Sequence, residues 1–457
     1  MLLEIIKSKG LAHNSYFLAD GEEALVVDPR RDCIIYTQLA KRECAEIKYI
    51  LETHRNEDYV VGSVELQNLT DAEIGHSKET SFKYGEHCFS GGETFEIGSL
   101  KVKTLHTPGH TNDSMCYIVY GSMKGKDPMM VFTGDTLFAG DIGRTDLLGL
   151  DVWQQQTEKL YDSLHEKLLP LGDHVLVYPA HGAGSICGHE ISDQEFSMIG
   201  YERKTNPLFQ MGKEAFTEYV MKQKLLKPPY FRKMEDYNLN GPPLLCKTPA
   251  LEPLSVVEFE EEMHKPNTIV LDTREPDAFA GSHIPGSLNI WLDGLSFFPG
   301  WIVIYDQRIM LVTERKEDME IAEAYLRRLG YDNLVGYLCP SIKEWRNLGK
   351  PVEHLGTLSA TAVKEKLDNK EIILIDVREE REWDKGHIEG AERIYVGHLM
   401  EEANKLPRNM PIATTCGWGG RGGLGASILK KLGFNEVYNA LGGMKAWSSL
   451  GYPLKKE

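Results

Sequence analysis

Two stretches in the second half of the chain repeat the same alternation of apolar runs and polar turns. Residues 267–290 (NTIVLDTREPDAFAGSHIPGSLNI) and 371–394 (EIILIDVREEREWDKGHIEGAERI) align without a gap, and 326–337 later matches 429–440. Each copy has an apolar strand, a DxR turn, a second apolar strand and an amphipathic helix that ends at Leu-Gly. This alternation predicts doubly wound parallel sheets, and a period of about 100 residues predicts duplicated domains rather than a solenoid.

The first half has a different pattern, in which short strand-like runs are separated by polar turns. EALVVDP and LKVKTLHTPGH are two such runs, and DVWQQQTEKLYDSLHEKLLPL is a helical stretch between strands. The mixture predicts β-strands covered by helices. A proline-rich, weakly periodic stretch follows and predicts a linker, because proline interrupts both helices and central strands. The predicted α/β organisation is a domain at 1–235, a linker at 236–254, and repeats at 255–352 and 353–457.

Composition and charge restrict the class of protein further. The 457 residues, 42% of them hydrophobic and 26% charged, predict about three folded domains. A net charge of −17 argues against nucleic acid or an anionic membrane surface as the main partner. The sequence contains no apolar run of about 18 residues, so no membrane span is expected. Eight scattered cysteines without a CxxC pair, and a start without a secretory leader pattern, predict a cytoplasmic protein with reduced thiols.

Several residues that could bind a metal lie in the first half, each in a loop after an apolar run. THRNEDYVVGS carries His54 and Asp58, TPGHT carries His110, FTGDTLFAGDIGRTDL carries Asp135, and VYPAHG carries His181. One histidine alone is weak evidence, since most histidines are surface or core residues. Loops at strand ends can bring distant parts of a chain together, so five such residues predict a metal site.

These motifs, in this order, resemble the metallo-β-lactamase superfamily over roughly residues 1 to 230, and most of all its persulfide dioxygenase branch. The resemblance implies an αββα sandwich. It also implies one Fe(II) per chain, held by His54, His110 and Asp135. Two histidines and one carboxylate leave positions open on the iron for a persulfide and O₂. Asp58 and His181 would not bind the iron but would orient its ligands or bound water by hydrogen bonds.

The loop at 54–59 departs from a two-metal enzyme of the glyoxalase II type, which has HxHxDH there. Asn56 and Tyr59 take the places of two histidines. A phenol replaces a neutral imidazole poorly because its pKa is high, so a second metal is not expected. Relatives in the dioxygenase branch usually keep a histidine at Asn56. A zinc thioester hydrolase and a metal-free scaffold domain remain as alternatives.

Two further residues in this half are candidates for substrate handling. Arg144, in GRTD, matches a position that would pair with a carboxylate of the thiol carrier, which is glutathione, coenzyme A or another thiol. Cys187, in GSICG, is either a buried packing residue or a thiol near the iron that relays sulfane sulfur.

The second repeat resembles the rhodanese family, with DVREEREW, GHIEGA and the cysteine loop TTCGWGGRGG (414–423). Cys416 and Arg421 have the C-x-x-x-x-R spacing of an active loop. A short loop that enters a helix directs backbone N–H groups at one sulfur, stabilising the thiolate and then the persulfide. Arg421 would hold the anionic end of a donor such as thiosulfate. The expected substrate-binding residues of the loop are Gly417, Trp418, Gly419 and Gly420.

Three features of the repeats are less regular. Gly422 stands where the family often has Ser or Thr, and Trp418 is open to two interpretations, a gate over the loop or a packing residue. Cys416 itself has the alternative role of a buried structural cysteine. The first repeat has Val312 or Thr313 at the cysteine position, which predicts an inactive domain that serves as a spacer or docking element.

Together these resemblances imply a persulfide dioxygenase joined to an inactive and an active rhodanese domain. The iron domain would oxidise a low-molecular-weight thiol persulfide with O₂ to sulfite. Cys416 would exchange sulfane sulfur with thiosulfate, sulfite or a thiol, in a direction that the sequence leaves open. We expect small-molecule partners and a homo-oligomer. The non-enzymatic alternative is a carrier or sensor of sulfane sulfur in which only Cys416 reacts.

Overall fold

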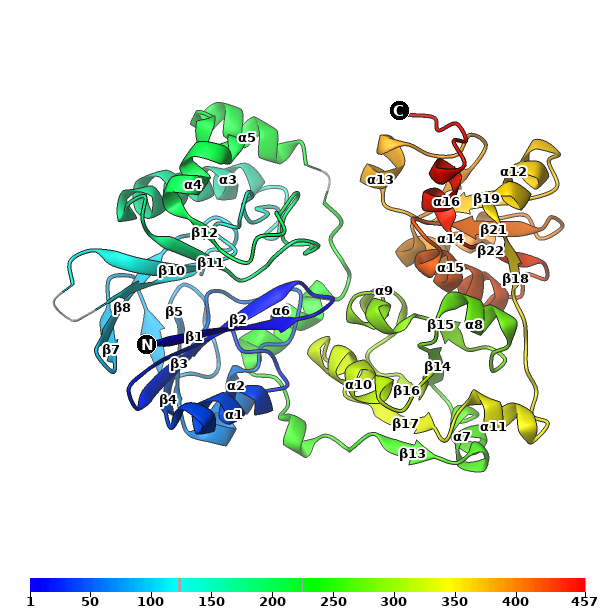
Figure 1. Cartoon of the computed structure of the whole chain (residues 1–457), viewed down its shortest axis with the longest axis horizontal. Coiled ribbons are helices and arrows are strands. Elements are labelled where there is room, and N and C mark those ends of the chain that lie inside the picture. Colours follow the sequence, from blue (N-terminus) through cyan, green and yellow to red (C-terminus); the bar gives the residue numbers. More distant parts are fainter. Residues whose placement is uncertain (122–124, 224, 457) are drawn as a thin grey trace. The chain divides into compact units, whose positions relative to one another are not determined.

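The computed structural model describes residues 1–121, 125–223 and 225–456 (Figure 1). The chain folds into two compact units. Unit 1 comprises Met1–Thr248 with Arg328–Gly330, and unit 2 comprises Pro249–Arg327 with Tyr331–Glu457. Among the described helices, none is both long enough and apolar enough to cross a membrane.

Unit 1 contains two six-stranded sheets. The first has the strand order β1 (Leu2–Ser8), β2 (His13–Asp20), β3 (Glu23–Val27), β4 (Glu46–Leu51), β5 (Glu73–Ser77), β6 (His87–Phe89). The second has the order β12 (Ser197–Met198), β11 (Leu176–Pro179), β10 (Pro128–Gly134), β9 (Met115–Tyr120), β8 (Leu100–His106), β7 (Thr94–Ile97). The helices are α1 (Ile34–Glu43), α2 (Ser63–Thr70), α3 (Trp153–Asp162), α4 (Ile199–Thr205), α5 (Lys213–Met221) and α6 (Phe231–Asn240).

The two sheets pack face to face, and helices cover their outer faces (Figure 1). Alternate residues of a strand point to opposite faces, and in β2 both faces are apolar. Tyr16 and Leu18 join the core between the sheets, whereas Phe17 packs with α1 and α2. On the other side, Leu160 of α3 and Phe216 of α5 pack against the second sheet. The predicted αββα sandwich is confirmed.

Unit 2 contains two five-stranded sheets whose strand pairs are all parallel. One has the order β13 (Glu252–Leu254), β17 (Leu334–Leu338), β16 (Arg308–Val312), β14 (Thr268–Asp272), β15 (Leu288–Asn289). The other has the order β18 (Gly356–Leu358), β22 (Val437–Ala440), β21 (Ile412–Thr415), β19 (Ile373–Asp376), β20 (Glu392–Arg393). The strand order is the same in both, as expected for duplicated domains.

Ten helices of the described chain accompany these sheets. They are α7 (Val256–Met263), α8 (Pro276–Gly281), α9 (Pro299–Ile302), α10 (Asp318–Arg328), α11 (Ile342–Asn347), α12 (Ala360–Asp368), α13 (Glu380–Lys385), α14 (Leu399–Glu402), α15 (Gly420–Lys431) and α16 (Gly443–Ser449).

The repeated DxR turn has a structural function in both domains. The Arg378 guanidinium donates to both carboxylate oxygens of Asp376, with Nε 2.9 Å from Oδ1 and Nη2 2.7 Å from Oδ2. Its Nη2 also reaches the carbonyl of Gly386 at 2.9 Å. Arg274 pairs with Asp272 in the same way. These buried pairs hold the turn to the start of the following segment, and so explain the repeat without chemistry.

The proline-rich segment is more ordered than its composition suggests. Helix α6 continues to Asn240, five residues past the boundary expected at 235, and β13 pairs with β17 at the other end of the expected linker. Asn238 of α6 is buried and forms hydrogen bonds with the loop that carries His54. The linker at 236–254 therefore includes the end of a helix that supports the candidate metal site.

Candidate metal centre and sulfur-transfer loop

The five candidate metal residues lie in loops that follow strands, as the sequence predicts. His54 and Asp58 lie between β4 and α2, and His110 follows β8. Asp135 directly follows β10, and His181 follows β11, which lies next to β10 in the same sheet. All five side chains are buried. The fold thus brings residues from four separate segments into one cluster.

His54, His110 and Asp135 face a common point. The Asp135 Oδ2 atom lies 3.6 Å from His110 Nε2 and 4.0 Å from His54 Nε2. The other ring nitrogens are engaged elsewhere: His54 Nδ1 lies 2.9 Å from the Thr53 hydroxyl, and His110 Nδ1 lies 2.7 Å from the Arg144 carbonyl. These contacts fix both rings with Nε2 towards the cluster, the usual arrangement of metal-binding histidines.

The atoms that face this point are the ones without partners. Within the described part of the chain, His54 Nε2, His110 Nε2 and Asp135 Oδ2 are buried and make no hydrogen bond. Burying polar groups without a partner costs about 1–3 kcal/mol each. A divalent cation would satisfy all three at once, so these residues fit a metal ion.

Asp58 and His181 lie behind this group. His181 Nδ1 is 2.8 Å from Asp135 Oδ1, and His181 Nε2 is 3.0 Å from Asp58 Oδ2. Both nitrogens of His181 are therefore used by carboxylates, and His181 orients Asp135. The Tyr59 ring packs against the buried His13 ring at a tilt of 35°, with centroids 4.1 Å apart, and its centroid lies 6.4 Å from that of His181. An aromatic ring thus stands at the loop position where a two-metal enzyme has a histidine.

Asn56 shapes the loop. Its Nδ2 donates to the carbonyl of His54 at 3.2 Å, and its own backbone carbonyl accepts from Asn238 at 2.7 Å. Asn238 also donates to the carbonyl of Tyr59 and accepts from the Val61 backbone. Asn238 could not be identified from the sequence, because nothing in its neighbourhood indicates a contact with a loop about 180 residues earlier.

Glu57 is a second residue of the site that the sequence motifs do not indicate. Its Oε1 atom lies 3.3 Å from His110 Nε2, and its Oε2 lies 3.8 Å from His54 Nε2. Burial alone would raise the pKa of Glu57, but His110 and His54 outweigh burial and hold that pKa at about 2. Burial would likewise lower the pKa of His110, yet Glu57 and Asp135 raise it to about 9. The site therefore contains two carboxylates beside two histidines.

In unit 2, the loop that carries Cys416 connects β21 to α15. The Cys416 Sγ atom is buried and accepts hydrogen bonds from the backbone N–H groups of Gly419 at 3.1 Å and Gly422 at 3.3 Å. This is the arrangement of N–H donors around one sulfur that the sequence predicts. Gly419 has φ +126°, which disfavours any side chain, and a Cβ at Gly422 would lie 2.4 Å from Asn439 Oδ1. A side chain at Gly422 would therefore require Asn439 to move.

Arg421 is held beside the loop by a partner from another element. Its Nη1 and Nη2 donate to both carboxylate oxygens of Glu382, at 2.5 and 2.7 Å. Burial alone would raise the pKa of Glu382, but Arg421 keeps that pKa below its usual range. Glu382 thus fixes the guanidinium and partly neutralises it, an interaction that the sequence spacing does not reveal.

Comparison with known proteins agrees with this architecture. The family model for the metallo-beta-lactamase superfamily matches residues 8–181, and the model for the rhodanese-like domain matches 255–348 and 359–450. A probable metallo-hydrolase of Bacillus subtilis is 33% identical over 189 residues, which are 37% of this chain and 84% of that protein.

The chain belongs to the metallo-β-lactamase superfamily. Two rhodanese-like domains follow its metallo-β-lactamase domain. The human mitochondrial persulfide dioxygenase ETHE1 is 30% identical over 222 residues, covering 47% of this chain and 78% of that protein. A crystal structure of a metallo-beta-lactamase from Staphylococcus aureus has a TM-score of 0.66 at 28% identity and covers 74% of this chain and 98% of its own. The predicted family and domain types are confirmed.

Within the metallo-β-lactamase domain, the Arg144 side chain is surrounded by protein partners. It is 2% exposed and pairs bidentately with Asp146, with both N–O distances 2.7 Å. Its Nη1 donates to the carbonyls of Ile186 and Leu226 at 3.2 and 2.9 Å. Four of its five N–H donors are thus used inside the protein. This geometry favours a structural role over the expected contact with the carboxylate of a thiol carrier.

We therefore expect Arg144→Lys to destabilise the domain rather than weaken substrate binding. A lysine cannot replace the bidentate pair and both carbonyl contacts, and the loss of these contacts around a buried cation should cost about 3 kcal/mol. The apparent midpoint of thermal unfolding should fall, while KM for a thiol persulfide stays within about twofold in the folded fraction. A large increase in KM with unchanged thermal stability would instead support a contact with the substrate.

Cys187 lies against the metal cluster but is poorly suited to ionise. Its thiol donates to Glu57 Oε1 at 3.6 Å and is fully buried. Burial, and then the carboxylates of Asp58 and Glu57, raise the pKa of the Cys187 thiol well above its usual range. The neutral thiol favours a packing role. Sulfur relay through Cys187 stays a prediction.

Trp418 lies at the mouth of the rhodanese loop. It is 46% exposed, and its ring meets Trp291 of the first rhodanese-like domain edge-on, with centroids 5.5 Å apart. The backbone N–H of Asn289 in that domain donates to Ser427 of α15 at 3.1 Å. The first rhodanese-like domain therefore packs on the helix that follows the cysteine loop and places an aromatic ring beside Trp418.

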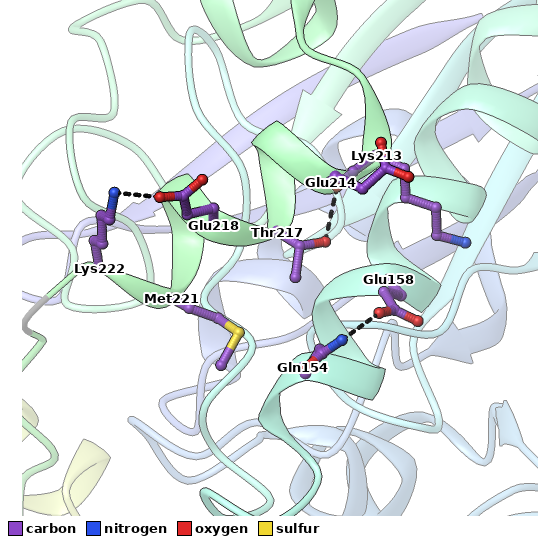
Figure 2. A pocket seen from close by; sticks show the side chains of 8 residues that line it. All are labelled: Gln154, Glu158, Lys213, Glu214, Thr217, Glu218, Met221 and Lys222. Atoms are coloured by element: carbon purple, nitrogen blue, oxygen red, sulfur yellow. Dashed lines mark hydrogen bonds and ion pairs between the residues drawn. The ribbon is translucent and has the colours of Figure 1, made fainter.

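A groove of about 550 Å³ lies between α3 and α5, away from both centres. Figure 2 shows that its polar side chains pair with one another: Lys222 with Glu218, and Gln154 with Glu158. No residue of the metal cluster lines it among the described residues. The groove carries no group suited to sulfur chemistry.

Proposed function

We propose that the metallo-β-lactamase domain is a non-haem iron persulfide dioxygenase. The observation that carries the proposal is the buried group of His54 Nε2, His110 Nε2 and Asp135 Oδ2, whose unpartnered atoms face one point. The identity to persulfide dioxygenase ETHE1 supports the same activity. A bound Fe(II) would supply open positions at which a persulfide sulfur and O₂ meet.

The reaction would be RSSH + O₂ + H₂O → RSH + SO₃²⁻ + 2 H⁺. The chain's own residues would position the metal and keep bulk water away. Thr53 and the Arg144 carbonyl fix the two histidine rings, and His181 orients Asp135. Burial of every ligand strengthens these interactions, because the local dielectric is low.

We further propose that Cys416 is the nucleophile of a sulfurtransferase. Its thiolate would attack the outer sulfur of thiosulfate, giving the Cys416 persulfide and releasing sulfite. The persulfide would then pass its outer sulfur to a thiol, RSH, giving RSSH and the Cys416 thiol. The N–H groups of Gly419 and Gly422 would stabilise the negative sulfur at each stage. RSSH is the substrate of the first domain, so the two activities can act in sequence.

A zinc thioester hydrolase is the second candidate, because a probable metallo-hydrolase has 33% identity to this chain. The two functions are distinguished by metal content and O₂ uptake. We expect the protein purified without oxygen to hold about one iron per chain and to consume O₂ with glutathione persulfide or coenzyme A persulfide. Zinc together with thioester hydrolysis, and no O₂ uptake with either persulfide, would overturn the proposal.

A further inference from the structure

Glu57 occupies a place in the metal cluster to which neither the resemblance nor the spacing of the loop assigns a ligand. It is 1% exposed, and its two carboxylate oxygens lie 3.3 Å from His110 Nε2 and 3.8 Å from His54 Nε2. His54, Glu57 and His110 form a group whose ligand atoms lie within 4.8 Å of one another. The carboxylate therefore faces the same two Nε2 atoms that Asp135 Oδ2 faces.

Hydrogen bonding alone does not account for this arrangement. A proton on His110 Nε2 could bridge to Glu57 Oε1, but Glu57 Oε2, His54 Nε2 and Asp135 Oδ2 would still be buried without a partner among the described residues. A protonated His110 would supply one positive charge between the two carboxylates, but it would leave those three atoms without a partner. A divalent cation provides that charge and satisfies all four groups.

The spacing of the ligand atoms also agrees with one shared ion. Nitrogen and oxygen ligands at about 2.1 Å from a metal lie about 3.0 Å apart at an octahedral edge, about 3.4 Å apart at a tetrahedral edge and about 4.2 Å apart when opposite. The four distances that Glu57 and Asp135 make to the two Nε2 atoms are 3.3, 3.8, 3.6 and 4.0 Å. All four lie in that range.

We propose that Glu57 is a fourth protein ligand, so that the centre has two histidines and two carboxylates. Asn56, which replaces a histidine of the relatives, bonds within the loop through its amide, and the next residue places a carboxylate in the cluster. The Cys187 thiol, which donates to Glu57 Oε1, holds the carboxylate in place. This inference requires that the domain bind a metal, but it does not depend on dioxygenase activity.

The test is Co(II) binding to the full chain after its metal has been removed with a chelator. Co(II) absorption reports both affinity and the number and type of ligands. We expect Glu57→Gln to weaken Co(II) binding by at least about tenfold and to change the shape of the visible bands. Glu57→Asp keeps the charge but shortens the side chain, so it should also weaken binding if the carboxylate must reach the ion.

Glu52→Gln is the matched control. Glu52 is equally buried and lies two residues before His54, but its carboxylate accepts from the Tyr84 hydroxyl at 2.9 and 3.0 Å. Glutamine keeps an acceptor there, so Co(II) affinity and spectrum should match those of the wild type. Circular dichroism of each metal-free variant verifies that it is folded.

Unchanged affinity and an unchanged spectrum in Glu57→Gln would overturn the inference. Wild-type binding in Glu57→Asp together with weak binding in Glu57→Gln would also overturn it, because charge at a distance would then suffice. Normal Co(II) binding by a wild-type protein that consumes no O₂ with persulfides would refute only the proposed function. Two ions in the wild type, one of them weakened by Glu57→Gln, would support Glu57 but overturn the single-metal centre.

Discussion

Replacing His110 with alanine is expected to remove the metal and abolish persulfide-dependent O₂ uptake, while sulfur transfer at Cys416 continues. The His110 Nε2 atom lies close to the carboxylates of Glu57 and Asp135. Alanine removes this nitrogen and with it one of the metal ligands. Metal affinity should fall by at least about 100-fold, since loss of groups that merely orient ligands already costs about ten- to a hundredfold. Metal quantification and an oxygen electrode measure the two effects.

A histidine four residues earlier provides the control for this variant. His106 Nε2 contacts the backbone carbonyl of Asn112 at 2.8 Å and is not part of the buried cluster. His106→Ala should therefore keep the metal and the O₂ uptake. If His110→Ala retains one ion per chain with normal affinity, the assignment of His110 as a ligand is wrong.

Replacing Cys416 with serine is expected to abolish sulfur transfer from thiosulfate but to leave O₂ uptake with a preformed thiol persulfide unchanged. A serine oxygen cannot form the persulfide, so transfer should fall by at least about 10³-fold. O₂ uptake that depends on thiosulfate and a thiol should disappear as well, because no persulfide is then made. Sulfite release from thiosulfate and a thiol without O₂ measures sulfur transfer, and oxygen consumption with preformed persulfide measures the dioxygenase.

Cys339→Ser is the matched control, since Cys339 lies in the first rhodanese-like domain, after β17 and outside the cysteine loop of the second. It should leave both activities unchanged. Loss of O₂ uptake with preformed persulfide in Cys416→Ser would show that the first domain receives its sulfur only through Cys416. The two activities would then not be separable.

Much of this architecture follows from local patterns. The two aligned repeats predict two parallel sheets of the same strand order, because strand and helix periods are set by backbone geometry that neighbouring residues share. The metal residues lie after β4, β8, β10 and β11, where apolar runs end in short polar loops. Cys416 and its N–H donors follow from a loop of fixed length at the start of a helix.

Other features depend on which side chains meet in space. Glu57 lies between His54 and Asp58 in an irregular loop, where spacing does not determine the direction of a side chain. Arg144 was expected to bind a substrate, and its use by Asp146 and two carbonyls is visible only in the fold. Asn238 was placed in a linker, yet it holds the metal loop together.

The sequence by itself determined the αββα domain, the duplicated parallel-sheet domains, the histidines and aspartates at strand ends, and the glycine-rich cysteine loop. Only the tertiary structure decided that Glu57 joins the metal cluster, that Glu382 holds Arg421, and that Trp291 of the first rhodanese-like domain meets Trp418. The physical reason is how far apart the interacting residues lie in the sequence. Periodicity and loop length reflect interactions between close neighbours in the chain, whereas the partner of a buried charge is chosen by packing between segments far apart in the sequence.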